Sequence, residues 1–242
     1  MSESLTPTKP ARKKGGFFSN LVFNIIIPVV ILSKFSGEAH LGPMWALVVA
    51  LAFPVVYGCW DFVRSDKVNF FSVLGVISVL LTGGIGLLQL DPAYIAIKEA
   101  AVPAVLGIAV IFTHNTRFSL VRKLLLNEDL IRTDKLAAAL AAKQATEQFE
   151  QKVKISTYLL ASSFALSAVL NYVLAKWIVV SPAGTEAFNA EIAKMTAWSF
   201  PVIAIPCTII MMGAVLYLFS QIGKLTGEEL DQFLVGAPES ST

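Results

Sequence analysis

The sequence predicts an all-α, polytopic membrane protein: a bundle of six transmembrane helices with both termini in the cytoplasm. Three observations predict this class. The chain contains six long apolar stretches, its 242 residues are 55% hydrophobic but only 15% charged, and lysine and arginine are distributed very unevenly between alternate connections. A soluble domain of this size carries more charge. Each stretch approaches the roughly 20 residues that cross a hydrocarbon core about 30 Å thick.

The expected spans lie in one membrane domain, residues 17–220, between a basic cytoplasmic tail (residues 1–16) and a second cytoplasmic tail (residues 221–242). The third span is the clearest because it has no ionisable residue. The first is the weakest because Asn20, Asn24 and Pro28 interrupt it, and a cleaved signal peptide is the alternative there. The spans are expected at Phe17–Phe35, Leu41–Phe62, Phe70–Leu90, Tyr94–Thr113, Ser156–Val180 and Ala197–Ser220.

Basic residues set the expected orientation, because connections rich in lysine and arginine stay on the cytoplasmic side. Fifteen of the 19 lysines and arginines fall in the tails and connections that would be cytoplasmic. Only Lys34, Lys176 and Lys194 fall on the other side, and Lys98 lies within a span. Both termini are therefore expected in the cytoplasm, which an even number of spans permits.

The connection at residues 114–155 is the only sizeable polar region. Its first part combines Phe118, Val121 and Leu125 with basic neighbours, which suits a helix lying on an anionic membrane surface. Its second part begins at Asp134, the expected N-cap, and has high helix propensity. We expect this helix to continue straight into the fifth span. It is either a docking surface for a partner or a solvated extension without one.

Small residues form a stripe along the third span, where they recur about every four residues. Such a stripe lets a neighbouring helix approach closely. The alternative is a helix broken at Thr82–Gly86, whose freed backbone groups bind a substrate or an ion. Close packing is the preferred interpretation. The residues are Gly75, Ser78, Thr82, Gly83, Gly84 and Gly86.

Lys98 and Glu99 are the only charged residues well inside an apolar stretch, so they are candidates for a functional role. They lie about 10 Å from the expected start of their helix, within reach of the membrane interface. Adjacent residues project about 100° apart on a helix, so we expect the two side chains to be poorly placed to pair. They either anchor the helix or form a buried ion site. Further polar positions in the bundle are Asn20, Asn24 and Asn171.

Motifs of soluble catalysis are missing from the sequence, which contains no GxxxxGK[ST], GxGxxG, HExxH or CxxC pattern. His40 and His114 fall in expected connections on opposite sides of the membrane and cannot share a metal. No cofactor is expected, and an enzyme is disfavoured. Nucleic-acid binding is disfavoured too, because the net charge is only +2 and no concentrated basic patch appears beyond the amino-terminal cluster.

Several short features follow one another in a characteristic order over most of the chain. They are Pro28–Val30, Lys34, Trp45–Leu47, Arg64, Lys67, Gly83–Gly84, Asp91, Lys98, Leu120–Leu124 and Asn171–Tyr172. In this order the chain resembles the bacterial intracellular septation protein A family, small inner-membrane proteins linked to envelope synthesis and division. The stretch Asn69–Asp91 resembles more closely the core of an uncharacterised proteobacterial membrane-protein family. The amino-terminal tail and the extension Asp134–Val153 are longer here than in the septation family.

The resemblance implies a non-enzymatic structural or interaction protein of envelope maintenance or septation, located in the bacterial inner membrane. Its expected partners are the lipid bilayer, envelope or division membrane proteins, and a second copy of the chain. The alternative is a small solute or ion transporter or channel that uses Lys98 and Glu99. A transporter requires a polar path around these residues, whereas a structural protein requires only surface contacts.

Overall fold

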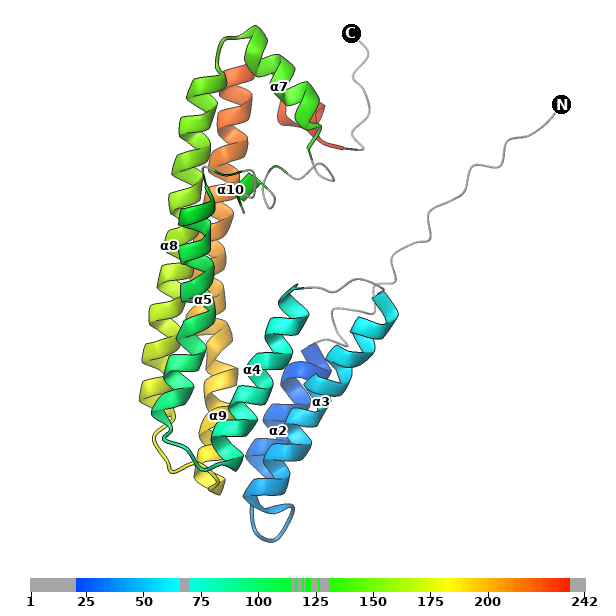
Figure 1. Cartoon of the computed structure of the whole chain (residues 1–242), viewed down its shortest axis with the longest axis vertical. Coiled ribbons are helices and arrows are strands. Elements are labelled where there is room, and N and C mark those ends of the chain that lie inside the picture. The colour runs from blue at the N-terminus through cyan, green and yellow to red at the C-terminus, as the bar shows by residue number, and fades with distance from the viewer. Residues whose placement is uncertain are drawn as a thin grey trace, which may run out of the picture. The chain divides into compact units, whose positions relative to one another are not determined.

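The computed structural model describes residues 21–65, 70–114, 116, 119, 121–122, 126 and 131–235, without the side chains of residues 61–73. These residues form helices joined by connections, which confirms the all-α class (Figure 1). The elements are η1 (Val22–Ile26), α2 (Ile27–Lys34), α3 (Gly42–Ser65), α4 (Phe70–Leu87), α5 (Ala93–Thr113), α7 (Thr133–Ala142), α8 (Thr146–Ile178), α9 (Glu186–Ser199), η2 (Phe200–Ala204), α10 (Ile205–Thr226) and η3 (Leu230–Phe233).

Four helical stretches are long and apolar enough to cross a membrane: Gly42–Trp60, Ala93–Thr113, Thr146–Ile178 and Glu186–Thr226. Two shorter apolar helices, Val22–Lys34 and Leu74–Leu87, lie where the first and third spans are expected. The described chain is therefore consistent with a multi-pass membrane protein. Six spans and the position of the termini stay predictions. The tail at residues 1–16 lies outside the described residues.

The last apolar helix begins at Glu186, well before the expected Ala197. Thr185 caps this helix, because its hydroxyl accepts a hydrogen bond from the backbone N–H of Phe188 at 3.1 Å. Glu186 follows in the first turn, where a carboxylate is favourable beside the positive end of the helix dipole. The helix also continues to Thr226, beyond the expected end at Ser220. Hydropathy alone missed both ends because they are polar.

Two prolines coincide with local widening of the helices. The π-helical segments η1 and η2 end at Ile26 and Ala204, two residues before Pro28 and Pro206. A proline donates no backbone hydrogen bond, and its ring collides with the carbonyl four residues earlier. A wider turn relieves that collision while the chain stays helical.

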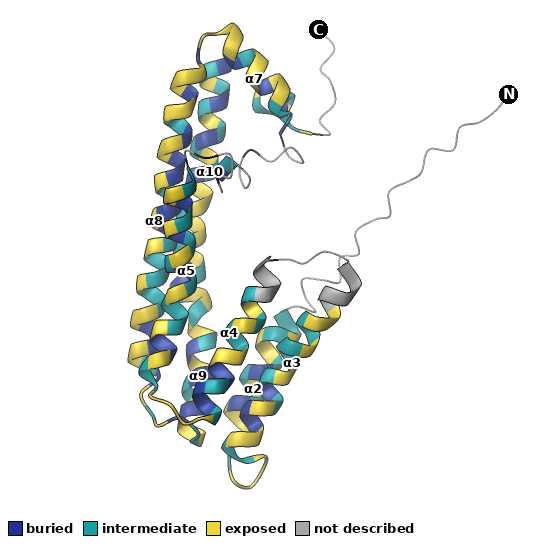
Figure 2. Ribbon diagram, viewed as in Figure 1, coloured by how far each residue is buried: buried dark blue, intermediate teal, exposed yellow. Residues whose placement is uncertain are grey.

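The described chain groups into two compact units. The first comprises the described residues up to Asp91 together with Ser181–Ala197, and the second comprises the described residues of Pro92–Val180 and those from Trp198 onwards. In the first unit, Phe23 of η1 stacks on Tyr57 of α3 with ring centroids 5.7 Å apart. Leu47 of α3 and Phe188 of α9 are fully buried there. In the second unit, α5 and α10 both pack against α8. Buried residues line the inner faces of these helices (Figure 2).

The polar connection folds back after Ala142, so the expectation of one straight helix from Asp134 is wrong, whereas its second half, from Thr146, does continue into the fifth span as α8. Helix α7 ends at Ala142, and Gln144 adopts a left-handed conformation with φ 52° before α8 begins at Thr146. The turn lets the apolar face of α7 bury itself in a core that a straight solvated helix would leave exposed. The N-cap is Arg132 rather than Asp134, which lies in the first turn.

The carboxyl-terminal turn closes this core. Phe233 of η3 is fully buried, and its carbonyl accepts a 2.7 Å hydrogen bond from the backbone N–H of Arg132. Ile131 and Leu234 form an isolated antiparallel bridge beside it. The core joins α7 and η3 to the ends of α8 and α10; its buried residues include Leu136, Leu140, Phe149, Val153, Leu218, Ile222 and Phe233. Val121, expected on a helix that lies on the membrane surface, is instead buried in this core, while Phe118 and Leu125 lie outside the described residues.

Candidate functional site

Lys98 and Glu99 form an ion pair on α5, contrary to the sequence expectation. The ammonium nitrogen of Lys98 lies 2.7 Å from Oε1 of Glu99, and the side chains are 8% and 26% exposed. Adjacent residues on a helix point in different directions, so the Cβ atoms of Lys98 and Glu99 are separated. The four-carbon lysine side chain is nevertheless long enough to bring its ammonium group to the Glu99 carboxylate. The pair carries no net charge. Pairing therefore offsets part of the cost of placing either charge in a medium of low dielectric constant.

The small residues of α4 do not all serve the same purpose. A Cβ atom on Gly86 would lie 2.3 Å from Cδ2 of Leu47, and one on Gly83 would lie 2.9 Å from Cδ1 of Leu51. Both glycines therefore face α3 at close range. A Cβ atom on Gly75 or Gly84 would meet nothing within 4 Å. The close approach is confined to Gly83 and Gly86, which lie three residues apart on one face.

Helix α4 is also unbroken through the stretch where the alternative placed a substrate-binding break. It runs from Phe70 to Leu87 without interruption. Thr82 is buried, and its hydroxyl donates to the carbonyl of Ser78 at 3.1 Å within the same helix. This local bond satisfies the hydroxyl and leaves the helix intact. The described backbone at Thr82–Gly86 therefore frees no group for coordination.

The three asparagines expected in the bundle differ in their positions and hydrogen bonds. Asn171 donates its amide to the carbonyl of Ser167 at 2.8 Å and to the Ser167 hydroxyl at 3.2 Å, both within α8. Asn24 lies in the π-helical segment η1 and is half-buried. Asn20 lies outside the described residues. The amide of Asn171 is therefore engaged by hydrogen bonds within its own helix, α8.

Asn189 is a fourth asparagine, which the sequence analysis missed. It is fully buried, and its amide nitrogen donates to the hydroxyl of Ser36 at 3.0 Å and to the carbonyl of Pro43 at 2.7 Å. Ser36 in turn donates to the carbonyl of Leu32 at 2.8 Å. One amide from α9 therefore ties the end of α2 to the start of α3. Thr185, as a helix cap, is the sequence signal that would have placed Asn189 in a helix.

A second polar contact fixes the chain ahead of α9. Glu191 accepts hydrogen bonds from the backbone N–H of Ser181 at 2.8 Å and from the Ser181 hydroxyl at 2.7 Å. These bonds close the turn between α8 and α9 onto the helix that follows it. Together with Asn189, they make this end of the first unit the place where polar side chains join separate elements.

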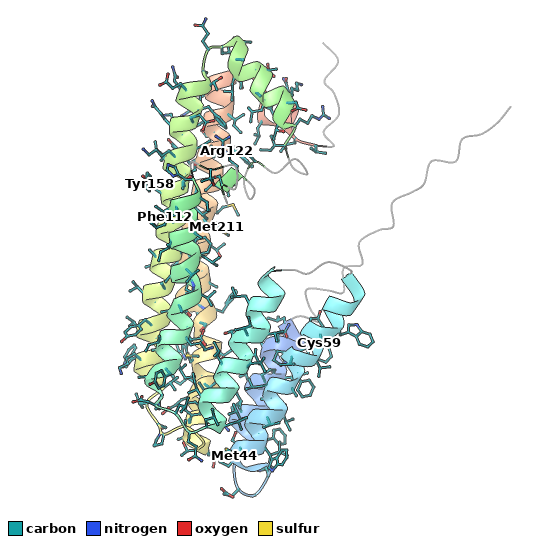
Figure 3. The ribbon with its side chains drawn as sticks, viewed as in Figure 1. Met44, Cys59, Phe112, Arg122, Tyr158 and Met211 are labelled. Atoms are coloured by element: carbon teal, nitrogen blue, oxygen red, sulfur yellow. The ribbon has the colours of Figure 1, made fainter. Side chains whose placement is uncertain are left out.

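Buried polar atoms without a partner are few in the described part of the chain. They are Nε2 of His114, the hydroxyl of Ser156 and Oδ1 of Asn189. The His114 ring lies 6.4 Å from the ring of Tyr158, and its Nδ1 lies 3.1 Å from the carbonyl of Ile111. Nearby, Arg122 and Glu150 form an ion pair in which both side chains are exposed. Figure 3 labels Arg122 and Tyr158 among the side chains of the second unit.

No cluster of three or more His, Cys, Asp or Glu side chains that could hold a metal ion occurs within the described ranges. Cys59 and Cys207 are both free thiols. No protein-family model, curated protein or solved structure matches the chain. The resemblances drawn from the sequence stay hypotheses.

Substituting Gly86 with Leu should lower the free energy of unfolding by about 1–3 kcal/mol, because the new side chain overpacks against Leu47 and Phe188. Gly84→Leu is the matched control, since open space lies beside Gly84 and its change should stay within about 0.5 kcal/mol. Unfolding in mixed detergent micelles measures both. Equal stability of the two variants would contradict the packing described for α4.

Substituting Asn189 with Ala should destabilise the protein by about 1–3 kcal/mol, because it removes two hydrogen bonds between elements and leaves a cavity at a buried site. Asn171→Ala is the control: its bonds lie within one helix, so its loss should be smaller. The same unfolding assay compares them. A larger loss for Asn171→Ala would show that the α9 contact is not a main connection of the first unit.

Proposed function

We propose that this protein is a non-enzymatic structural or interaction protein of the bacterial inner membrane that acts in envelope maintenance or septation. The membrane assignment rests on the four long apolar helices. The inner membrane and the biological process rest on the resemblance to the septation protein A family. The pairing of Lys98 with Glu99 is the observation that favours a structural role over transport.

A coupling site in a transporter needs a group that can exchange a proton or an ion while it is held in the membrane. In this chain the carboxylate of Glu99 is engaged by the ammonium of its neighbour, and the pair is electrically neutral. Releasing Glu99 to bind a cation would leave Lys98 as a competing positive charge at the same place. This arrangement favours anchoring of α5 over ion binding.

Several other polar side chains in the apolar helices bond within a single helix or to one neighbouring helix. Thr82 and Asn171 bond to the carbonyls of their own helices. Ser163 of α8 donates to the carbonyl of Cys207 of α10 at 2.8 Å. Each bond tightens a helix or joins two helices. Such bonds support a packed bundle, which is what a structural protein requires.

The surface of α7 is the region that we assign to partners. Its apolar face is buried in the core with Phe233, so the docking surface cannot be that face. The exposed face carries Asp134 and Lys135 together with alanines such as Ala138, and Lys143 follows at its end. A surface of small and charged residues suits a reversible protein contact. A second copy of the chain and an envelope or division protein are both candidates.

The proposed topology places reporter fusions after Lys67, Lys143 and Gly227 in the cytoplasm, and fusions at Gly37 and Gly184 in the periplasm. The physical reason is the excess of lysine and arginine in the connections that stay inside. Paired phosphatase and fluorescent-protein fusions measure both sides. A periplasmic signal at position 143 would contradict the six-span arrangement.

The change Glu99→Gln should keep membrane insertion and support cell division and envelope integrity but lower the stability of the protein, because the amide still accepts a bond from Lys98 while the lysine loses its counter-charge. Cell length and detergent sensitivity of a deletion strain carrying each variant measure this. Lys98→Arg is the matched control, since arginine also reaches the interface. Solute or ion flux in proteoliposomes that Glu99→Gln abolishes would overturn the structural role in favour of a transporter.

A further inference from the structure

Exposed aromatic side chains lie near both ends of the apolar stretches of α5 and α8 in the second unit, and Tyr172, Trp198 and Phe200 are exposed as well. On α8, Tyr158 and Trp177 are both exposed, and Trp177 is 81% exposed. On α5, Tyr94 and Phe112 are exposed too, Phe112 at 78%. Trp and Tyr concentrate at the two interfaces of a bilayer, where an amphipathic ring meets both the acyl chains and water.

The two pairs have nearly the same separation along their helices. Residues 158 and 177 are 19 positions apart and residues 94 and 112 are 18 apart, which corresponds to about 27–28 Å at 1.5 Å per residue. This distance is close to the roughly 30 Å thickness of a hydrocarbon core. Each helix therefore carries aromatic residues at both boundaries of one apolar layer.

The packing of α5 on α8 brings the two pairs to the same levels. A Cβ atom on Gly107 would lie 3.2 Å from Cβ of Phe164 and 3.6 Å from the carbonyl of Ala161, which fixes the register of the two helices. Helices α5 and α8 run in opposite directions. Phe112, five residues after Gly107 on α5, therefore lies at the level of Tyr158, which precedes Ala161 and Phe164 on α8. The ring of His114 accordingly contacts Tyr158. Phe112 and Tyr158 lie at similar heights in Figure 3. In the other direction, Tyr94 precedes Gly107 on α5 by 13 residues and Trp177 follows Phe164 on α8 by 13 residues, so these two side chains also lie at one level.

Charge changes at the same levels. Residues 158–175 of α8 contain no charged side chain, whereas Glu147, Glu150, Lys152 and Lys154 lie in the turns before Tyr158. Two exposed lysines flank this stretch: Lys154 lies four residues before Tyr158, and Lys176 follows Ala175 directly. Lysines at such positions extend their ammonium groups towards lipid phosphates. On α5, the charges between Tyr94 and Phe112 are those of the Lys98–Glu99 pair.

We infer that the second unit meets a bilayer whose hydrocarbon layer lies between the Tyr94–Trp177 level and the Phe112–Tyr158 level. This inference deepens the proposed function and rests on its membrane location. It places the Lys98–Glu99 pair about 6 Å inside one boundary, since Lys98 lies four residues from Tyr94, so the paired charges lie near the headgroups and not at the centre of the bilayer. It also places the core of α7 and Phe233 in water, because Phe149 and Val153 precede Tyr158 on α8.

The inference is tested by spin labels at exposed positions along one face of α8. Single cysteines replace Gln151, Ile155, Ser162, Ala165, Val169 and Val173 in the full chain with Cys59→Ser and Cys207→Ala. The protein is reconstituted in vesicles of phosphatidylethanolamine and phosphatidylglycerol. Relaxation by oxygen should peak between Ala165 and Val169, because oxygen concentrates at the bilayer centre. Relaxation by a water-soluble nickel complex should be strong at Gln151 and lost at Ala165.

An oxygen maximum at Ile155 or Val173, or protection of Gln151 from nickel, would overturn the register. A second measurement avoids the cysteine changes. In a variant with Trp45, Trp60 and Trp198 replaced by Phe, bromine near the headgroup should quench Trp177 fluorescence more than bromine near the end of the acyl chain. The opposite order would also overturn the register. Flux that depends on Glu99 would instead overturn the structural role and leave the register intact.

Discussion

The structure depends on one constraint: a polar group placed among apolar helices must find its partner in its own helix or in an adjacent one, because lipid offers none. Several of the described side chains follow this rule, whereas the buried hydroxyl of Ser156 has no partner within the described ranges. Thr82 and Thr157 bond to carbonyls four residues earlier. Ser163 reaches a carbonyl of α10. Lys98 and Glu99 form an ion pair on a single helix, which offsets part of the cost of their position.

The same constraint explains how prolines occur in these helices without breaking them. The segments η1 and η2 widen ahead of Pro28 and Pro206, and the chain then continues as α2 and α10. A change of hydrogen-bond register costs less than exposing free carbonyls to lipid. Helices α8 and α10 are consequently long enough to extend beyond an apolar layer. Their ends meet α7 and η3 in an apolar core that continues to Val110 of α5 and Leu160 of α8.

That core decides what the apolar face of the polar connection packs against. As an amphipathic sequence it has two possible uses, because an apolar helical face can bury itself on a partner or within its own chain. The left-handed Gln144 and the buried Phe233 show that this chain uses it internally. Any partner of α7 is left with its exposed face, which carries Asp134 and Lys135 among alanines. This face lacks large apolar side chains, which favours reversible association over a permanent hydrophobic complex.

The sequence alone determined the helical class and the approximate positions of the apolar helices, because length and hydropathy act locally and need no knowledge of neighbours. It also located Lys98 and Glu99, but not their pairing, which depends on side-chain rotamers. It singled out the small residues of α4 as a group. Only packing against Leu47 and Leu51 separated Gly83 and Gly86 from Gly75 and Gly84.

Tertiary structure alone decided the role of Asn189, whose two partners lie about 150 residues away in the chain. It also decided the fold of the connection, since the burial of Leu136 and Phe149 requires the carboxyl-terminal Phe233. No local pattern records such long-range contacts. The free energy that selects them comes from burying apolar surface and pairing polar groups between segments that the sequence keeps apart.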